Sequence, residues 1–124
     1  PVYYAHPSGR ILSFLDRVFY SAKSAFVHKP AAVISSSRRA GSVTSMDVLN
    51  KHLSISEMPI VTSNYWNEVH GHTPSDVEQD REGLDTMYAL GKNMAWMLKC
   101  FEAGKEAGIP LPSAEREHRT HFIR

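Results

Sequence analysis

Two arginines and a glycine stand at the end of a predicted strand, where they could hold a ligand. Arg38 and Arg39 are followed after one residue by Gly41. A guanidinium supplies a permanent cation, and a glycine lets the backbone approach a bound group closely. The alternative is that the arginines are a solvated surface pair. The sequence alone leaves both interpretations open.

Two histidines, His70 and His72, occupy alternate positions in the segment HGH. Alternate residues of a loop can chelate a metal, but no third ligand with a recognised spacing accompanies them. We therefore predict a polar loop and no metal. The sequence also shows no Ser-His-Asp arrangement and no paired carboxylates, and we assign no catalytic side chain. Asp16 is expected to form a structural ion pair with a nearby arginine.

Composition indicates one ordered domain with no strong electrostatic preference. The 124 residues are 42% hydrophobic and 22% charged, and 14 Lys plus Arg against 13 Asp plus Glu give a net charge of +1. Such a balance argues against nucleic acid or anionic lipid as a partner. No apolar run is long enough to cross a membrane. The single cysteine, Cys100, lies in an apolar segment and is expected to be a core thiol, which fits a reducing, cytoplasmic location.

Hydrophobic periodicity predicts helices alternating with short strands. The first helix should be capped by Ser8 and run to about Ser21. The apolar run 31–34 reads as a buried strand. Thr44 or Ser45 should cap a second helix.

A second buried strand is expected over about 59–63, followed by a loop over 64–76. The last helix should end at Gly108 and Pro110. The apolar stripe of this helix is predicted to face the core, and the glycine on it is expected to mark close packing against a neighbouring element. The stripe consists of Leu84, Met87, Gly91, Met94, Leu98 and Phe101.

This alternation is typical of a doubly wound α/β fold with a parallel sheet. Two strands are too few for such a sheet, so residues 1–4 are expected to be the carboxyl end of a further strand, and the sheet to be incomplete at its N-terminus. Residues 1–109 would form this domain and residues 110–124 a charged tail. Taken alone, the 124 residues are expected to be marginally folded and inactive.

Four segments together resemble the carboxyl-terminal part of the flavodoxin-like NAD(P)H-dependent FMN reductases. They are PVYYAHPSGRILSFLDRVFY, AAVISSSRRAGSVTSMDVLN, MPIVTSNYWNEVHG and DREGLDTMYALGKNMAWMLK. Ser13 departs from the lysine usual in the family. The strand and serine-rich loop that hold the FMN phosphate in the family have no counterpart here, and neither does the cysteine segment of its iron-sulfur subgroup.

The resemblance implies that three loops hold FMN, all following strand ends and all on one edge of the sheet. Tyr65 and Trp66 would wall the flavin ring, or else they are packing aromatics. The implied cofactor-binding residues are Pro1, Val2, Tyr3, Tyr4, Ala5, Arg38, Arg39, Ala40, Gly41, Ser42, Tyr65 and Trp66.

The implied function is that of an FMN-dependent oxidoreductase. NADH or NADPH would reduce the flavin, which would pass the hydride to a small-molecule acceptor such as a quinone or free flavin, in a homodimer. The alternative is a flavodoxin-type electron carrier or a flavin-binding module without turnover. A carrier would show an acidic docking face, and the net charge of +1 argues weakly against it.

Overall fold

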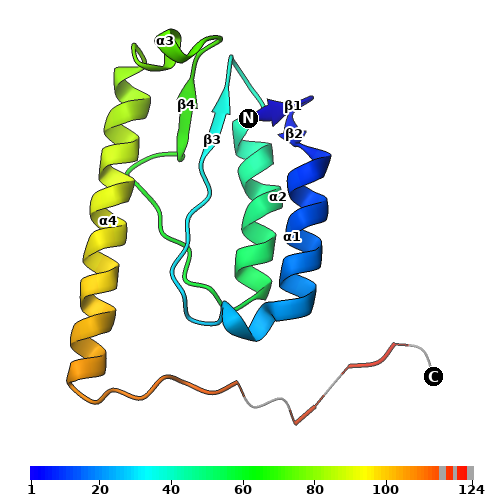
Figure 1. Ribbon diagram of the computed structural model, residues 1–124, viewed down its shortest axis with the longest axis vertical. Helices are drawn as coiled ribbons and strands as arrows, with labels where there is room; N and C mark the ends of the chain where they lie inside the picture. The colour runs from blue at the N-terminus through cyan, green and yellow to red at the C-terminus, as the bar shows by residue number, and fades with distance from the viewer. Residues whose placement is uncertain (115–116, 119, 123–124) are drawn as a thin grey trace.

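The computed structural model describes residues 1–114, 117–118 and 120–122 of the chain. Figure 1 shows three layers, with a short parallel sheet in the middle. Helix α4 (Arg81–Glu106) covers one face, and helices α1 (Gly9–Ala22) and α2 (Ser42–Ile55) lie together against the other. This mixed α/β arrangement, with helices on both faces of parallel strands, confirms the predicted flavodoxin-like fold class.

Helix α1 begins where the sequence predicts, because the Ser8 hydroxyl accepts a hydrogen bond from the N–H of Ile11. The helix is followed by a single 3₁₀ turn, η1 (Lys23–Ala25). Among the described residues, no arginine pairs with Asp16, contrary to the prediction. Its carboxylate lies 2.9 Å from Nε2 of His52 and so links α1 to α2.

The parallel sheet is formed by residues for which loops were predicted. Strand β3 (Ser35–Ser37) pairs with β4 (Glu68–His70), whereas the predicted strands over 31–34 and 59–63 contribute one isolated bridge between Ala31 and Ile60. The hydrophobic runs are therefore not the strands. Serines can form β3 because its ladder is made by the backbone, and small side chains fit where Ser35 and Ser37 are buried.

The pairing changes register between the bridge and the strands. The offset between partners is 29 residues at Ala31 and Ile60 and 33 residues at Ser35 and Glu68. The segment 61–67 is thus longer than the segment opposite it and bulges out of the sheet. Asn67 bridges the gap: its backbone carbonyl accepts from the N–H of Ser35, and its side-chain amide donates to the carbonyl of Val33.

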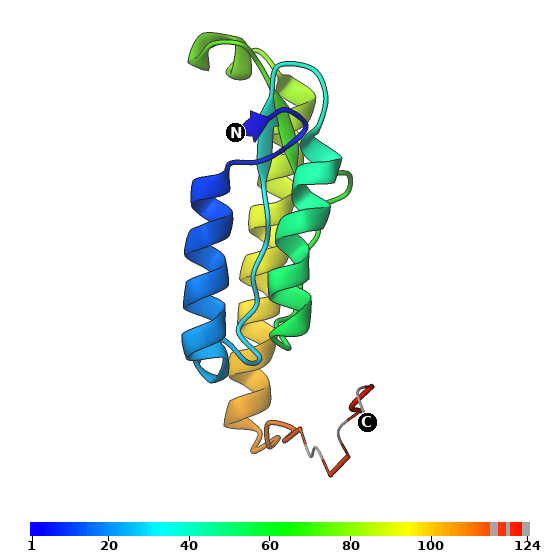
Figure 2. The same ribbon diagram turned by 90° about the vertical axis from the view of Figure 1, so that its right-hand side faces the viewer.

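The first residues form a tight hairpin rather than the end of a parallel strand. Strands β1 (Val2–Tyr3) and β2 (His6–Pro7) pair antiparallel around Tyr4 and Ala5. Both turn residues have positive φ, 47° and 60°, as a two-residue type I′ turn requires. Non-glycine residues adopt this conformation at a cost of about 1–2 kcal/mol each. Figure 2 shows the hairpin beside the upper ends of α1 and α2.

Helix α2 begins at Ser42, before the predicted Thr44 or Ser45. Its N-cap is Gly41, which has a φ of +94° and provides no side-chain cap. The arginine-containing turn therefore leads straight into the helix.

Helix α4 is capped by Asp80, and the first half of the helix is the packed half. Its buried residues are Gly83, Thr86 and Leu90, one position off the predicted stripe. Leu98, Cys100 and Phe101 are exposed. No atom of the described residues lies within 4 Å of the Cβ position of Gly91. The predicted core stripe, the close contact at Gly91 and the core thiol are wrong for this chain. The helix passes into a turn at Gly108, whose φ is +76°, as predicted.

The predicted loop over 64–76 contains β4 and the start of α3 (Pro74–Val77). Among the described helices, none combines the length and the apolar composition needed to cross a membrane.

Candidate functional site

A hollow of about 410 Å³ lies where three segments meet at the carboxyl ends of β3 and β4. The first residues of the hairpin, Pro1 and Val2, form one wall. Residues 36–38 form the second, and residues 71–74, which follow β4, form the third. In parallel α/β sheets ligands bind at this edge. The hollow is thus a candidate ligand site by its position and its shape.

Gly41 fixes the hairpin against the turn that follows β3. A Cβ atom built on Gly41 would lie 2.6 Å from the backbone Cα of Ala5 and 2.8 Å from Cγ1 of Val2. Only a residue without a side chain fits there. Next to it the buried hydroxyl of Ser42 donates to Oγ of Ser37 at 2.8 Å, which ties the start of α2 to the end of β3.

The two arginines of this turn are not equivalent. Arg38 lines the hollow, whereas Arg39 is outside the set of residues that form it. Within the described part of the chain, no backbone carbonyl or side chain accepts a hydrogen bond from the N–H groups of residues 38–41. The turn therefore combines unused donors, a cation and a close backbone contact. Such a turn suits the acceptor-rich, planar edge of a flavin.

The third wall is held by two aspartates that the sequence reasoning missed. The carboxylate of Asp80 accepts from the N–H of Gly83 at 3.0 Å and from the N–H of His70 at 2.7 Å. These bonds, that of Gly83 first, hold the pKa of Asp80 below its ordinary value. Asp80 thus joins the start of α4 to β4.

Asp76 forms a capping box with Thr73 at the start of α3. The N–H and the hydroxyl of Thr73, followed by the N–H of His72, lower the pKa of Asp76. The sequence signal was available, since Thr73-Pro-Ser-Asp76 is a capping pattern with proline at the first helical position.

Tyr65 and Trp66 do not lie with the other two predicted loops. They precede β4, and parallel strands place the segment before a strand away from the edge that follows it. Both rings are more than half exposed, with centroids 6.4 Å apart. The expected location of residues 64–67 on the same edge is wrong, because the strand comes after these residues rather than before them.

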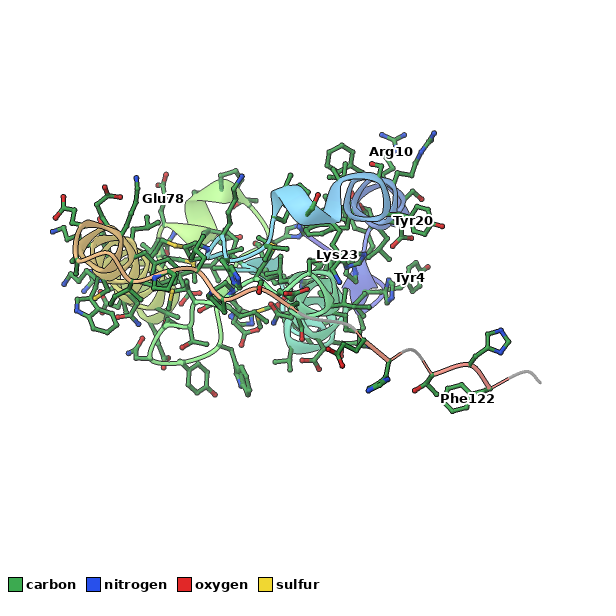
Figure 3. All side chains as sticks on the ribbon, turned by 90° about the horizontal axis from the view of Figure 1, so that it is seen from below. Tyr4, Arg10, Tyr20, Lys23, Glu78 and Phe122 are labelled. Atoms are coloured by element: carbon green, nitrogen blue, oxygen red, sulfur yellow. The ribbon has the colours of Figure 1, made fainter. Side chains whose placement is uncertain are left out.

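Tyr4 is the tip of the hairpin and projects away from the ribbon, as Figure 3 shows. It is fully exposed, and Tyr3 is more than half exposed. The backbone of residues 1–5 borders the turn at Gly41, while neither tyrosine ring is packed there.

The histidine pair separates in the structure. His72 lines the hollow, and Nδ1 of His70 lies 3.8 Å from the carboxylate of Asp80. Over the described residues, no group of three or more His, Cys, Asp and Glu side chains is placed to hold a metal.

A layered α/β fold with loops converging at the carboxyl ends of its parallel strands defines a flavodoxin-like protein with a ligand site at that edge. Residues 1–73 match the sequence model of the NADPH-dependent FMN reductases, and the chain belongs to this family. FMN and NAD(P)H are therefore its cofactors. The matched range includes the hairpin and residues 38–41, which we call the arginine turn. It also includes the third wall of the hollow as far as Thr73. No curated protein and no solved structure matches the chain.

Proposed function

We propose that the protein is an FMN-dependent oxidoreductase that takes a hydride from NADH or NADPH and delivers it to a small acceptor such as a quinone or free flavin. The observation that carries the proposal is the contact between Gly41 and the hairpin. It holds the backbone of residues 1–5 beside Arg38 and a turn whose N–H groups have no acceptor among the described residues, at the carboxyl ends of β3 and β4.

When bound, FMN carries out the hydride chemistry, and its reduced ring bears negative charge at the pyrimidine edge. The chain positions that edge. The N–H groups of residues 38–41 would donate to it, and the guanidinium of Arg38 would stabilise the charge. The backbone of Val2, Tyr3, Tyr4 and Ala5 would lie along the ring.

The remaining assignments belong to the same proposal. Ser42 would support the turn through its bond to Ser37. Arg39 does not line the hollow and would contribute only to the positive electrostatic potential around it. Tyr65 and Trp66, exposed on a separate part of the surface, would approach a flavin only in a homodimer, where they would face the partner's site. A cytoplasmic location fits the nicotinamide cofactor.

The arginine turn offers a matched pair of variants. Arg38→Gln should weaken FMN binding by about one to two orders of magnitude, because a hydrogen bond to a charged group is worth about 1.5–3 kcal/mol and each 1.4 kcal/mol is tenfold in affinity. Arg39→Gln, one residue away, should change it less than twofold. FMN fluorescence quenching measures the affinity, and NADPH oxidation with a quinone acceptor measures turnover.

Equal losses of FMN affinity in the two variants would show that Arg38 acts only through the positive electrostatic potential of the turn. Absence of FMN binding and of NADPH oxidation by the unsubstituted protein would refute the proposed function itself.

A further inference from the structure

The two outer edges of the parallel sheet differ in how their backbone groups are paired. The chain itself occupies the outer edge of β4. The N–H of Glu68 donates to the carbonyl of Trp66, and the N–H of His70 donates to the carboxylate of Asp80, both at 2.7 Å. Edge strands in folded proteins are usually protected by devices of this kind. A further strand cannot pair with β4 without breaking these bonds.

The outer edge of the segment 31–37 has no such protection. In a parallel pair, alternate residues direct both backbone groups to the neighbouring strand. Ser35 and Ser37 direct theirs to β4, where their partners include the backbone of Asn67 and Gly71. The alternate residues of the segment point the other way. Within the described part of the chain, no hydrogen bond is formed by the backbone N–H or C=O of residues 32, 34 and 36.

This edge therefore presents N–H and C=O groups at the spacing at which a β-strand pairs. Such a row is a template for an added strand, whose own backbone supplies the complementary groups. Water can also satisfy exposed backbone groups, so the surroundings of the edge decide what binds there.

An apolar groove of about 270 Å³ lies along this edge. Helix α1 contributes Ile11, Leu15 and Phe19 to its lining, and the segment itself contributes residues 32–34. Figure 2 shows the segment running lengthwise between α1 and α2. No residue of α1 is buried, although the helix has a strongly apolar face, and Ile34 is 61% exposed. The apolar surface on this side of the sheet is thus only partly covered.

The groove has no free charge with which to bind an ion. The one titratable residue of its lining is His52, and Nε2 of this histidine lies 2.9 Å from the carboxylate of Asp16. An unpaired charge placed in the groove would lose its hydration without gaining a partner. The lining therefore favours neutral, apolar side chains.

The layers of the fold favour a parallel strand at this edge. Helix α4 covers one face of the sheet, and α1 and α2 lie against the other, as Figure 1 shows. Strands between two helical layers are typically parallel and carry apolar side chains on both faces. A second copy of the chain, paired through its own β3 about a two-fold axis perpendicular to the sheet, would run antiparallel. A single added strand instead continues the β3–β4 pairing in the direction already established.

We propose that the open edge of the segment 31–37 binds an extended, apolar peptide segment as a further strand of the sheet, parallel to β3. The backbone of this peptide pairs with the free N–H and C=O groups of residues 32, 34 and 36. Its side chains alternate between the groove beside α1 and the face covered by α4. The inference does not depend on FMN binding beside Arg38.

The probe for the test is a synthetic peptide of alternating valine and isoleucine, flanked by lysine pairs that keep it soluble and labelled with fluorescein for anisotropy. A matched peptide has the same side chains but carries N-methyl groups on every central residue, which removes its backbone donors. The unmodified peptide should bind saturably, and the N-methylated peptide should bind at least tenfold more weakly, because strand addition depends on backbone hydrogen bonds.

Amide hydrogen exchange, followed by NMR, locates the bound peptide. The N–H groups of Ile34 and Ser36 should exchange at least tenfold more slowly when the peptide is bound. The N–H of Ser35 is already paired with Asn67 and should change less. A nitroxide at the carboxyl end of the peptide should broaden the signal of Gly71, and one at the amino end should broaden that of Ala31.

A lysine substitution tests the same edge from the side of the protein. Ile34→Lys places a charge at the groove and should abolish peptide binding, whereas the exposure of Ile34 allows the fold to accommodate it. Ile55→Lys is the matched control. Ile55 is 72% exposed at the end of α2 and lies outside the groove, so this variant should leave the peptide affinity unchanged.

Four results would overturn the proposal. They are equal affinities for the two peptides, unchanged exchange at Ile34 and Ser36, indifference of binding to Ile34→Lys, and the reversed pattern of nitroxide broadening, which would show an antiparallel strand. Protection of Ile34 that increases with protein concentration in the absence of peptide would also overturn it, because a second copy would then occupy the edge.

Discussion

Replacing Gly41 with alanine is expected to abolish FMN binding and to lower the free energy of unfolding by about 2–5 kcal/mol. The new methyl group would have to occupy space within 2.6 Å of the Cα of Ala5, which is backbone and cannot rotate away. A side chain at the φ of +94° adds strain of about 1–2 kcal/mol, and overpacking adds about 1–3 kcal/mol. The hairpin must then separate from the arginine turn, which removes one wall of the hollow that is proposed to bind FMN.

Gly91→Ala is the matched control. In the part of the chain that the structure describes, no atom lies within 4 Å of the Cβ position of Gly91, and this glycine is inside α4, where alanine is favoured by about 1 kcal/mol. Thermal unfolding and FMN fluorescence quenching measure both variants. A Gly41→Ala protein with unchanged melting temperature and flavin affinity would show that the hairpin is not held by this contact.

Asp80→Ala is expected to lower the free energy of unfolding by about 2–5 kcal/mol. The substitution removes the cap of α4, worth about 0.5–2 kcal/mol, and the charge-assisted bond from the N–H of His70, worth about 1.5–3 kcal/mol. The N–H groups of Gly83 and His70 are then left without this acceptor. The third wall of the hollow should loosen, which hydrogen exchange of residues 70–83 would detect.

The same carboxylate gives the protein an acid-sensitive component of stability. Hydrogen bonds from Gly83 and then His70 hold the pKa of Asp80 below its ordinary value of 3.8. The unfolded chain therefore binds a proton at higher pH than the folded protein does. The stabilisation is fully present above pH 3.8 and is lost as the pH falls through the lower pKa of the folded state. Asp76, whose pKa is lowered mainly by the N–H of Thr73, acts in the same direction.

Asp85→Ala provides the control for this prediction, since Asp85 is an exposed residue on the first turns of the same helix. It should leave both the midpoint of denaturant unfolding and its acid dependence close to those of the unsubstituted protein. If Asp80→Ala lost as much stability between pH 6 and pH 3 as the unsubstituted protein, another group would have to be the source of the acid sensitivity.

Helices were predictable from this sequence because their signals are local. The Ser8 hydroxyl caps α1, and Gly108 follows the end of α4, at the positions that the residue types indicate. The packed face of α4 was not predictable in the same way. Its apolar stripe is continuous in the sequence, but Leu98 and Phe101 have no buried surroundings, because burial depends on what the rest of the chain brings to the helix.

The predicted strands were misplaced because, in this protein, the apolar residues are not the residues that pair in the sheet. The apolar residues Ala31 and Ile60 make only a bridge, and the ladder is formed by three serines opposite Glu68, Val69 and His70. A three-residue serine strand has no composition that distinguishes it from a loop. Its pairing is determined by a distant segment, which local sequence patterns do not report.

The candidate site was partly predictable for a related reason. The arginine turn and Gly41 follow a strand end directly, so a short error in the strand did not displace them. Tyr65 and Trp66 were assigned to the same edge because β4 was placed too early in the chain. The contributions of Asp76 and Asp80 depend on hydrogen bonds to backbone N–H groups, and only the folded chain brings those groups within reach.

The register change in the sheet means that the length of the bulge 61–67 is not fixed by the packing of the strands on either side of it. The offset grows from 29 to 33 residues, an even difference of four. Side chains alternate between the two faces of a sheet with a period of two, so an even insertion preserves the phase of the pleat and an odd one inverts it. Val69 therefore faces the side that it would face if the bulge were absent. The bulge can therefore change in length by an even number of residues without changing the face of the sheet on which Val69 lies.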